Sequence, residues 1–140
     1  MIAAAVMCLA LNVFHEARGE PLAGQIAVAQ VTINRAKEQD GVCSAVFEDK
    51  QFSWVDARTR VKRVDGKVVS IQLKRRALPN DERAWASAVS VAAGALAGVY
   101  PDYVRGAKFY HEKSVRPDWL KHFKKVAVIG NHVFYKGQKS

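Results

Sequence analysis

The sequence has few cysteines and no long hydrophobic run. Two cysteines in 140 residues exclude a disulfide-dense scaffold and a four-cysteine zinc fold. No apolar run approaches the roughly 20 residues that a membrane-spanning helix needs, so stable membrane insertion is not expected. The apolar N-terminus lacks the basic region and the cleavage pattern of a secretory signal, so no signal peptide is evident.

Two common catalytic motifs are also missing. His15 and Glu16 begin like the zinc motif H-E-x-x-H, but the position of its second histidine is Gly19. The other histidines have no ligand spacing, and no G-x-S-x-G nucleophile elbow occurs. We therefore predict no metal, no cofactor and no serine-hydrolase chemistry.

The chain does have an uneven distribution of positive charge. Its net charge of +9 is concentrated in residues 58–76, with eight basic residues and one acidic residue, and in residues 121–140, with five basic residues. Residues 1–57 are net acidic. These two basic segments suggest a polyanionic partner. Residues 58–76 resemble a ribbon that grips phosphates, but they lack the interleaved aromatics of a single-strand platform, so nucleic acid is not the predicted partner.

Hydrophobic periodicity predicts helices at about residues 2–18, 22–37 and 81–97, the last with Asn80 as its N-cap. Asp65-Gly66 predicts a basic hairpin within residues 56–78, which we interpret as an insertion. Gly130-Asn131 predicts a C-terminal hairpin in the same way. With no interdomain linker, residues 1–140 are expected to form a single α+β domain that is mainly helical with small β-hairpins.

The two cysteines leave an alternative open. Cys8 lies in the first predicted helix, and Cys43 follows the second. They could form a disulfide in an oxidising compartment or remain two buried thiols. The sequence favours the reduced state slightly.

The densest polar cluster lies at the end of the first predicted helix. Asn12 and Glu16 are four residues apart and therefore share a helix face. A carboxyl half-buried by this helix and the next should have a raised pKa, which is what a general acid needs near neutral pH. The alternative is a solvated helix end in which Glu16, Arg18 and Glu20 form local ion pairs.

Three further segments combine aromatic and hydrogen-bonding side chains, as carbohydrate sites do. Each alone is more typical of packing than of binding. The candidate side chains are Gln51, Ser53 and Trp54 in the first segment, Tyr110 and His111 in the second, and Trp119 in the third.

These residues lie in motifs that resemble the SleB-type cell-wall hydrolase family, which includes spore cortex-lytic enzymes and phage endolysins. The motifs are NVFHEARGEPLAGQIAVAQVTINR at 12–35, QFSW at 51–54, FYH at 109–111 and IGNHVFY at 129–135. The resemblance spans residues 8–135, and 56–78 is the least family-like part. It implies a lysozyme-like fold related to lytic transglycosylases, and cleavage of the β-1,4 bond between N-acetylmuramic acid and N-acetylglucosamine in peptidoglycan glycan strands.

The resemblance also implies residue roles. Glu16 is the expected catalytic acid and base. Glu20 is the alternative catalytic residue. If Glu20 is not catalytic, its expected role is structural, as an acid that fixes Arg18 or the start of the second helix. The expected substrate-binding residues are Glu20, Asn12, Gln51, Ser53, Trp54, Tyr110 and His111.

Two mechanisms and two non-enzymatic functions follow from this interpretation. The lytic route needs one carboxyl group and gives a 1,6-anhydro product, whereas muramidase-type hydrolysis needs a second carboxylate, for which Asp56 and Glu48 are weak candidates. A wall-binding or nucleic-acid-binding basic domain is the non-enzymatic alternative.

Residues 58–76 and the C-terminal tail are expected to bind anionic cell-envelope polymers. A compact, basic single domain without an evident leader favours a phage or prophage endolysin that is held in the host cytoplasm before it is released to act on the wall. A truncated piece of an exported enzyme is the alternative with the same features. We expect a monomer.

Overall fold

The computed structural model describes residues 3–48 and 51–138, which form helices and two small antiparallel sheets. The α-helices are α1 (Ala4–Ala17), α2 (Leu22–Ala36), α3 (Val42–Val46), α4 (Ser53–Arg58) and α5 (Glu82–Ala97). The strands are β1 (Thr59–Val64), β2 (Lys67–Leu73), β3 (Phe109–Glu112), β4 (Phe123–Ile129) and β5 (His132–Gln138). Two short 3₁₀ helices, η1 (Arg75–Ala77) and η2 (Asp118–His122), complete the list. No helix in these two ranges is both long and apolar enough to cross a membrane.

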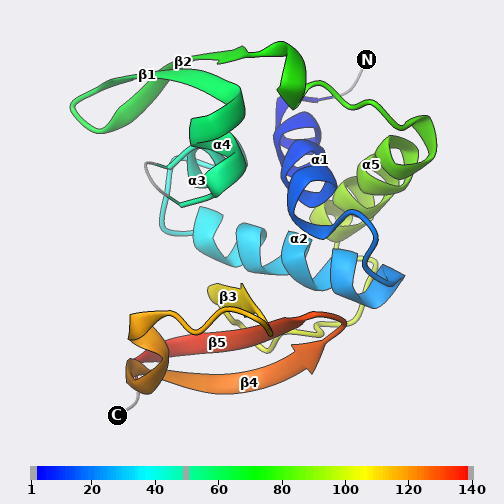
Figure 1. Ribbon diagram of the computed structural model, residues 1–140, viewed down its shortest axis with the longest axis vertical. Helices are drawn as coiled ribbons and strands as arrows, with labels where there is room; N and C mark the ends of the chain where they lie inside the picture. The colour runs from blue at the N-terminus through cyan, green and yellow to red at the C-terminus, as the bar shows by residue number, and fades with distance from the viewer. Residues whose placement is uncertain (1–2, 49–50, 139–140) are drawn as a thin grey trace.

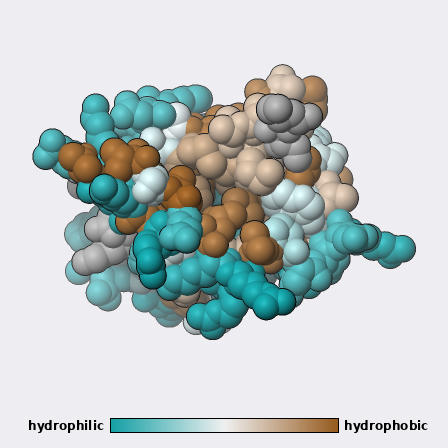
Figure 2. Space-filling model, turned by 90° about the horizontal axis from the view of Figure 1, so that it is seen from above, coloured by the Kyte–Doolittle hydropathy of each residue, from teal (hydrophilic) through white to brown (hydrophobic). Residues whose placement is uncertain are grey.

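The elements form tiers (Figure 1). Helices α1 and α5 lie above α2, the three-stranded sheet lies below α2, and the β1–β2 hairpin extends from the upper part of the molecule. Viewed from above, hydrophilic side chains surround a more hydrophobic central area (Figure 2). The architecture is α+β, as the sequence predicted.

The main hydrophobic core lies where α1, α2 and α5 meet. Leu9 and Val13 of α1 are completely or almost completely buried there, as is Val28 of α2. Small side chains such as Ala88 and Ala92 of α5 let the helix backbones approach closely. This packing explains why α1 is apolar almost all round and why its polar residues are few.

A second core forms between α1, α3, α4 and the hairpin. Phe47 and Trp54 are its largest buried members, and their rings meet edge to face at 5.8 Å. The indole of Trp54 donates from Nε1 to Asn12 Oδ1 at 2.8 Å, and Asn12 Nδ2 donates to Thr32 Oγ1 at 3.2 Å. These hydrogen bonds satisfy polar groups that would otherwise be costly to bury.

A disulfide joins Cys8 of α1 to Cys43 of α3. The slight preference for reduced thiols was therefore wrong. Because α1 and α3 pack together, the two cysteines face each other although 35 residues separate them. The sequence placed both cysteines near helices but carried no information about that packing.

The basic hairpin forms as predicted, with two adjustments. Its turn places Asp65 and Gly66 at φ angles of 52° and 78°, the left-handed conformation that a two-residue turn of this type requires. Residues 56–58 belong to α4 instead of the first strand, because the 51–54 segment leads into a short helix. Helix α5 starts one residue later than expected, and Asp81, not Asn80, caps it by accepting from Ala84 N at 3.1 Å.

The C-terminal hairpin also forms, and a third strand joins it. Strand β5 lies between β3 and β4, so β3 pairs with β5 through Tyr110 opposite Phe134. The sequence did not predict this pairing, because β3 is short and far from β5 along the chain. It brings the FYH segment, residues 109–111, beneath α1 and α2.

Candidate active site

A groove runs past Glu16 between α1, the start of α4 and the β3–β5 side of the sheet. It consists of two adjoining cavities of about 420 and 490 Å³. Four side chains line both cavities and mark the middle of the groove: Glu16, Gln51, Tyr110 and Trp119. The cavities are open to solvent and together suit an extended ligand better than a small enclosed one.

Glu16 is held at the centre by one strong hydrogen bond. Its position near the end of α1 leaves the carboxyl group half-buried, and Tyr110 Oη donates to Glu16 Oε1 at 2.7 Å. Burial raises the pKa of Glu16, and the charge of Glu112 adds to the rise, while the Tyr110 hydrogen bond and His132 oppose it. The balance is a carboxyl group that keeps its proton at a higher pH than an exposed glutamate does.

The hydroxyl group of Tyr110 is a reliable hydrogen-bond donor to Glu16. Its pKa lies well above the ordinary value, first because the phenol is buried and then because Glu16 is negatively charged when ionised. The hydroxyl therefore stays protonated and always offers a donor to Glu16. The edge of the His132 ring packs against the Tyr110 ring, with 5.1 Å between the centroids, and fixes the position of that ring.

One half of the groove combines positive charge with aromatic surface. Arg35 and Lys108 line it together with the rings of Phe109, Trp119 and Phe123. The Phe109 and Phe123 rings lie 4.5 Å apart, and Trp119 meets Phe123 edge to face at 5.2 Å. Faces of this kind stack against the C–H faces of sugar rings, while a cation can contact their polar groups.

Arg35 organises the end of this half. Its Nη2 donates to Gln51 Oε1 at 2.5 Å and to Glu48 Oε2 at 3.1 Å, and its Nη1 donates to the carbonyl of Lys108 at 3.1 Å. Arg35 of α2 thus holds the side chain of Gln51, which lines the middle of the groove. Glu48 is the ion-pair partner of Arg35, so its carboxylate makes a structural contact.

The other half of the groove is polar and contains two more carboxylates. Asp56 and Glu112 line it together with Ser53 and His111. His111 is fixed at both ring nitrogens, with Nε2 2.9 Å from Tyr135 Oη and Nδ1 2.6 Å from the carbonyl of Glu112. The groove therefore brings together most of the sequence candidates: Glu16, Gln51, Ser53, Tyr110, His111 and Trp119.

Asn12 and Trp54 do not reach the groove surface. Asn12 is fully buried and Trp54 is 4% exposed, and they hydrogen-bond to each other one helical turn before Glu16. The Trp54 ring also stacks on His15 at 4.4 Å. In this arrangement the two side chains support the end of α1 and make no contact available to a ligand, in contrast to the substrate-binding roles expected for them.

Glu20 lies outside the groove and fastens the C-terminal hairpin. Its Oε1 accepts from the backbone N–H of Asn131 at 2.7 Å. His132 Nδ1 lies 3.0 Å from the same oxygen, and this contact is an ion pair when the imidazole is protonated. A Cβ atom at Gly130 would lie 2.8 Å from that oxygen, so glycine is required for the close approach. The side chain of Glu20 thus contacts the C-terminal hairpin, whereas Arg18, its expected structural partner, pairs with Asn80 and Asp81.

Several residues of the groove were not found from the sequence: Arg35, Lys108, Glu112, Phe123 and His132. Arg35 and His132 do lie in the family-like motifs, which was the available signal. The others become neighbours only through the β3–β5 pairing. Within residues 3–48 and 51–138, no three His, Cys, Asp or Glu side chains form a cluster that could hold a metal ion.

Comparisons with known proteins identify the family of this chain. The family model described as "Cell Wall Hydrolase" matches residues 19–135. A spore cortex-lytic enzyme from Halalkalibacterium halodurans is 29% identical over 133 residues, which are 92% of this chain and 34% of that protein. The chain thus spans about a third of that relative's length.

Two solved structures share the fold. The catalytic domain of the germination-specific lytic transglycosylase SleB from Bacillus anthracis aligns with a TM-score of 0.67 at 24% identity, covering 97% of each chain. The catalytic domain of the Bacillus cereus SleB protein aligns with a TM-score of 0.64 at 24% identity, covering 97% of this chain and 93% of that one. The fold is therefore the lysozyme-like fold of the SleB catalytic domains, and the chain belongs to the cell wall hydrolase family.

Proposed function

We propose that this protein cleaves the glycan strands of peptidoglycan as a lytic transglycosylase, cutting between N-acetylmuramic acid and N-acetylglucosamine. The observation that supports this best is the Glu16 carboxyl group, with its raised pKa and its Tyr110 hydrogen bond, at the centre of an open groove. The names of the spore cortex-lytic relative and of the SleB structure point to the same substrate class.

The first half of the proposed reaction is proton donation by Glu16. The Tyr110 hydrogen bond occupies Oε1, which leaves Oε2 to carry the transferable proton. Glu16 gives this proton to the oxygen that bridges the two sugars, and the bond from that oxygen to C1 of the muramic residue breaks. Positive charge develops at C1 and is stabilised by the carboxylate that Glu16 has become.

In the second half, the C6 hydroxyl group of the same muramic residue attacks C1. Its proton passes to the Glu16 carboxylate, which returns to the starting state, and a 1,6-anhydro ring forms. No water is consumed and no second carboxylate is needed. A positioned acid and base of this kind contributes about 10²- to 10⁴-fold to the rate.

Hydrolysis is the second candidate, and one observation favours it. Asp56 and Glu112 line the same half of the groove beside Glu16, which offers a second carboxylate for a water molecule or for the charged intermediate. Asp56 was a weak candidate in the sequence because its region looked variable, and Glu112 was not considered. Both residues now become specific targets for substitution.

Mass spectrometry of soluble fragments from digested peptidoglycan separates the two reactions. Anhydro-muramic ends, about 18 Da lighter than their hydrated counterparts by the loss of one water, are expected for the lytic route. In that case Asp56→Asn and Glu112→Gln keep most of the turnover. Reducing muramic ends, with turnover lost in one of these variants, would replace the lytic mechanism by hydrolysis. Release of stem peptides alone would overturn the glycosidase assignment.

The proposal extends to the setting of the enzyme. We propose a monomeric phage endolysin that is held in the host cytoplasm and acts on the wall after release. The Cys8–Cys43 disulfide makes this hypothesis specific, because the cytosol keeps thiols reduced and the bond would form only after release. Thiol alkylation before and after lysis of producing cells should show free cysteines first and a disulfide later. A disulfide already present before lysis would favour an exported enzyme instead.

A further inference from the structure

A second cavity, separate from the groove, lies on the other side of α1. Its volume is about 670 Å³, and it shares no lining residue with either half of the groove. Four arginines line it: Arg18, Arg58, Arg75 and Arg76. His15 and Asn80 add polar atoms, and Phe14 and Leu78 add apolar surface.

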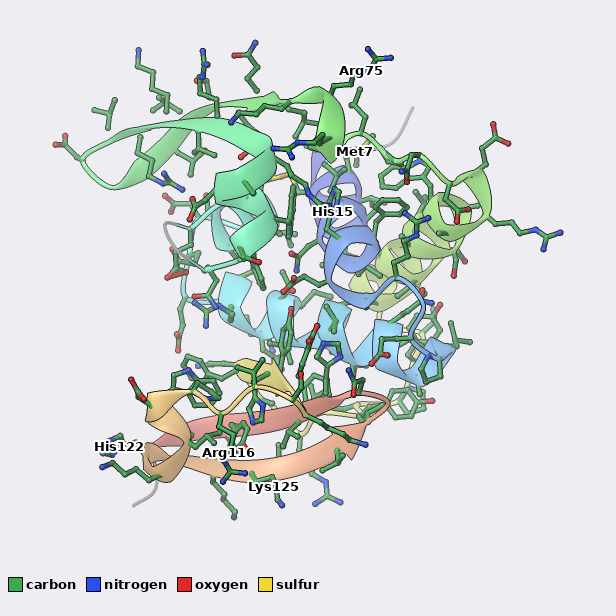
Figure 3. The ribbon with its side chains drawn as sticks, in the orientation of Figure 1. Met7, His15, Arg75, Arg116, His122 and Lys125 are labelled. Carbon is green, nitrogen blue, oxygen red and sulfur yellow. A yellow bond between two sulfur atoms is a disulfide. The ribbon has the colours of Figure 1, made fainter. Side chains whose placement is uncertain are left out.

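The two ends of the basic segment create this concentration of charge. Arg58 ends α4 just before strand β1, and Arg75 and Arg76 form η1 just after strand β2. Pairing of the strands continues to this point, because the backbone N–H of Lys74 donates to the carbonyl of Arg58 at 2.9 Å. The hairpin therefore brings Arg58 close to Arg75 and Arg76 although the strands separate them along the sequence, and Figure 3 shows Arg75 at the top of the molecule.

Two of the arginines are held in place before any ligand arrives. Arg18 donates to Asn80 Oδ1 at 2.8 Å and to Asp81 Oδ2 at 3.1 Å, and its guanidinium lies 5.0 Å from the centre of the Phe14 ring. Arg58 donates from Nη1 to His15 Nδ1 at 2.8 Å. The opposite nitrogen of His15 lies 2.9 Å from the carbonyl of Ala77, so the imidazole proton belongs on Nε2.

The positive charge of the cavity is largely uncompensated. Arg18 has Asp81 as its ion-pair partner, but no carboxylate in residues 3–48 and 51–138 forms an ion pair with Arg58, Arg75 or Arg76. Like charges gathered in one cavity raise the free energy of the unoccupied protein. A ligand with concentrated negative charge would relieve this repulsion and could be contacted by several guanidinium groups.

We propose that this cavity, termed the arginine pocket, binds a phosphate group carried on a polyol or sugar. Phosphate offers several charged oxygens to the guanidinium groups, whereas a single carboxylate offers two. The volume exceeds that of a lone phosphate, and Phe14, Leu78 and Asn80 provide apolar and amide surface for the attached carbon skeleton. A polymer of such units would keep the enzyme on the envelope while the separate groove remains free.

Isothermal titration calorimetry at physiological salt tests the proposal with four probes: inorganic phosphate, pyrophosphate, a glycerol phosphate polymer and a single-stranded oligonucleotide. The test variant is Arg58→Ala/Arg76→Ala. The matched control is Lys37→Ala/Lys113→Ala, which removes the same charge from exposed positions that lie outside both basic segments and line neither the arginine pocket nor the groove. We expect the test variant to weaken binding of pyrophosphate and of the polymer at least tenfold and the control to change it less than twofold.

The arms of the experiment also identify the source of the phosphate. Tighter binding of the polymer than of pyrophosphate supports a polymeric ligand, and the reverse order supports a small phosphate ester. Equal weakening by both variants would overturn the proposal in favour of general surface charge. Absence of binding to the unsubstituted protein would overturn it outright, and tighter binding of a single-stranded oligonucleotide would replace the polyol by nucleic acid.

The proposal does not depend on the chemistry assigned to Glu16. Because the groove and the arginine pocket share no residues, Glu16→Gln should bind the probes normally whether or not glycan cleavage is confirmed. Because Arg58 and Arg76 are exposed, their replacement should leave the unfolding temperature unchanged. Thermal unfolding of each variant checks that a loss of binding comes from the missing side chains and not from a change in the fold.

Discussion

His15 and Glu16 are neighbours in the sequence, yet they point about 100° apart around α1 and line two different cavities. His15 lines the arginine pocket and Glu16 lines the groove. Burial lowers the pKa of His15, with Arg58 and Arg18 adding to the effect against the hydrogen bond to Ala77, and burial raises the pKa of Glu16. Both shifts favour the neutral form of the side chain. Burial therefore makes His15 an uncharged hydrogen-bonding group in the arginine pocket and makes Glu16 a proton donor in the groove.

The largest expected effect is that of Glu16→Gln. Gln keeps the size of the side chain but has no proton to give, so turnover of purified peptidoglycan should fall by about 10²- to 10⁴-fold. Turbidity loss and fragment release measure this. An active, normally folded Gln variant would move the catalytic role to Glu20.

Glu16→Gln should also change how the free energy of unfolding depends on pH. The pKa of Glu16 is higher in the folded protein than in the unfolded chain, so the folded protein binds more protons and its free energy of unfolding falls as the pH rises through the folded pKa. Glu16→Gln removes this loss and should be at least as stable as the unsubstituted protein near pH 7. Denaturant unfolding at pH 5 and pH 7 checks the sign, and a less stable variant at pH 7 would contradict the buried-carboxyl interpretation.

Next in size is Tyr110→Phe, which removes the hydrogen bond that lowers the pKa of Glu16. The pKa of Glu16 should rise further, so the high-pH decline in kcat/KM should move to higher pH. We also expect turnover to fall by about tenfold, since the lost hydrogen bond is one to an ionisable group. A lower rate with an unmoved pH profile would limit Tyr110 to a packing role.

Glu20→Gln should affect stability more than catalysis. The substitution weakens the contacts to the Asn131 N–H and His132, with an expected loss of about 1–3 kcal/mol in the free energy of unfolding. Turnover per folded molecule should stay within a few-fold. Loss of turnover as complete as that of Glu16→Gln, at unchanged stability, would show that Glu20 takes part in the chemistry.

The smallest expected effect is that of His15→Gln. Because the pKa of His15 is lowered by folding, the unfolded chain binds more protons as the pH falls from about 7 to 5, and stability declines over that interval. The Gln variant should show a shallower decline, while its turnover stays close to that of the unsubstituted protein. A large loss of turnover would mean that the two sides of α1 are coupled.

Local patterns in the sequence predicted the parts of this molecule that depend on neighbouring residues. Helical periodicity placed α1, α2 and α5 to within a few residues, and Asp65-Gly66 and Gly130-Asn131 located both hairpins. The position of Glu16 near the end of α1 followed from the same reasoning. In each case the physical cause lies within one turn of helix or one β-turn.

The remaining features depend on contacts between distant segments. Asn12 looked like a groove residue because it shares a helix face with Glu16, but Trp54 and Thr32 meet it in the core. The disulfide required the packing of α1 on α3, and the arginine pocket required the hairpin to bring Arg58 to Arg76. No periodicity or motif contains this information.

The Tyr110–Glu16 hydrogen bond joins residues 94 positions apart, and the Glu20–Asn131 contact spans 111. Helices α1 and α2 can form from local contacts, while the strand that carries Tyr110 pairs with β5, which follows it in the sequence. A growing polypeptide therefore holds Glu16 long before it holds the partner that tunes it. Glu16 therefore gains the partner that tunes its pKa only once β3 has paired with β5.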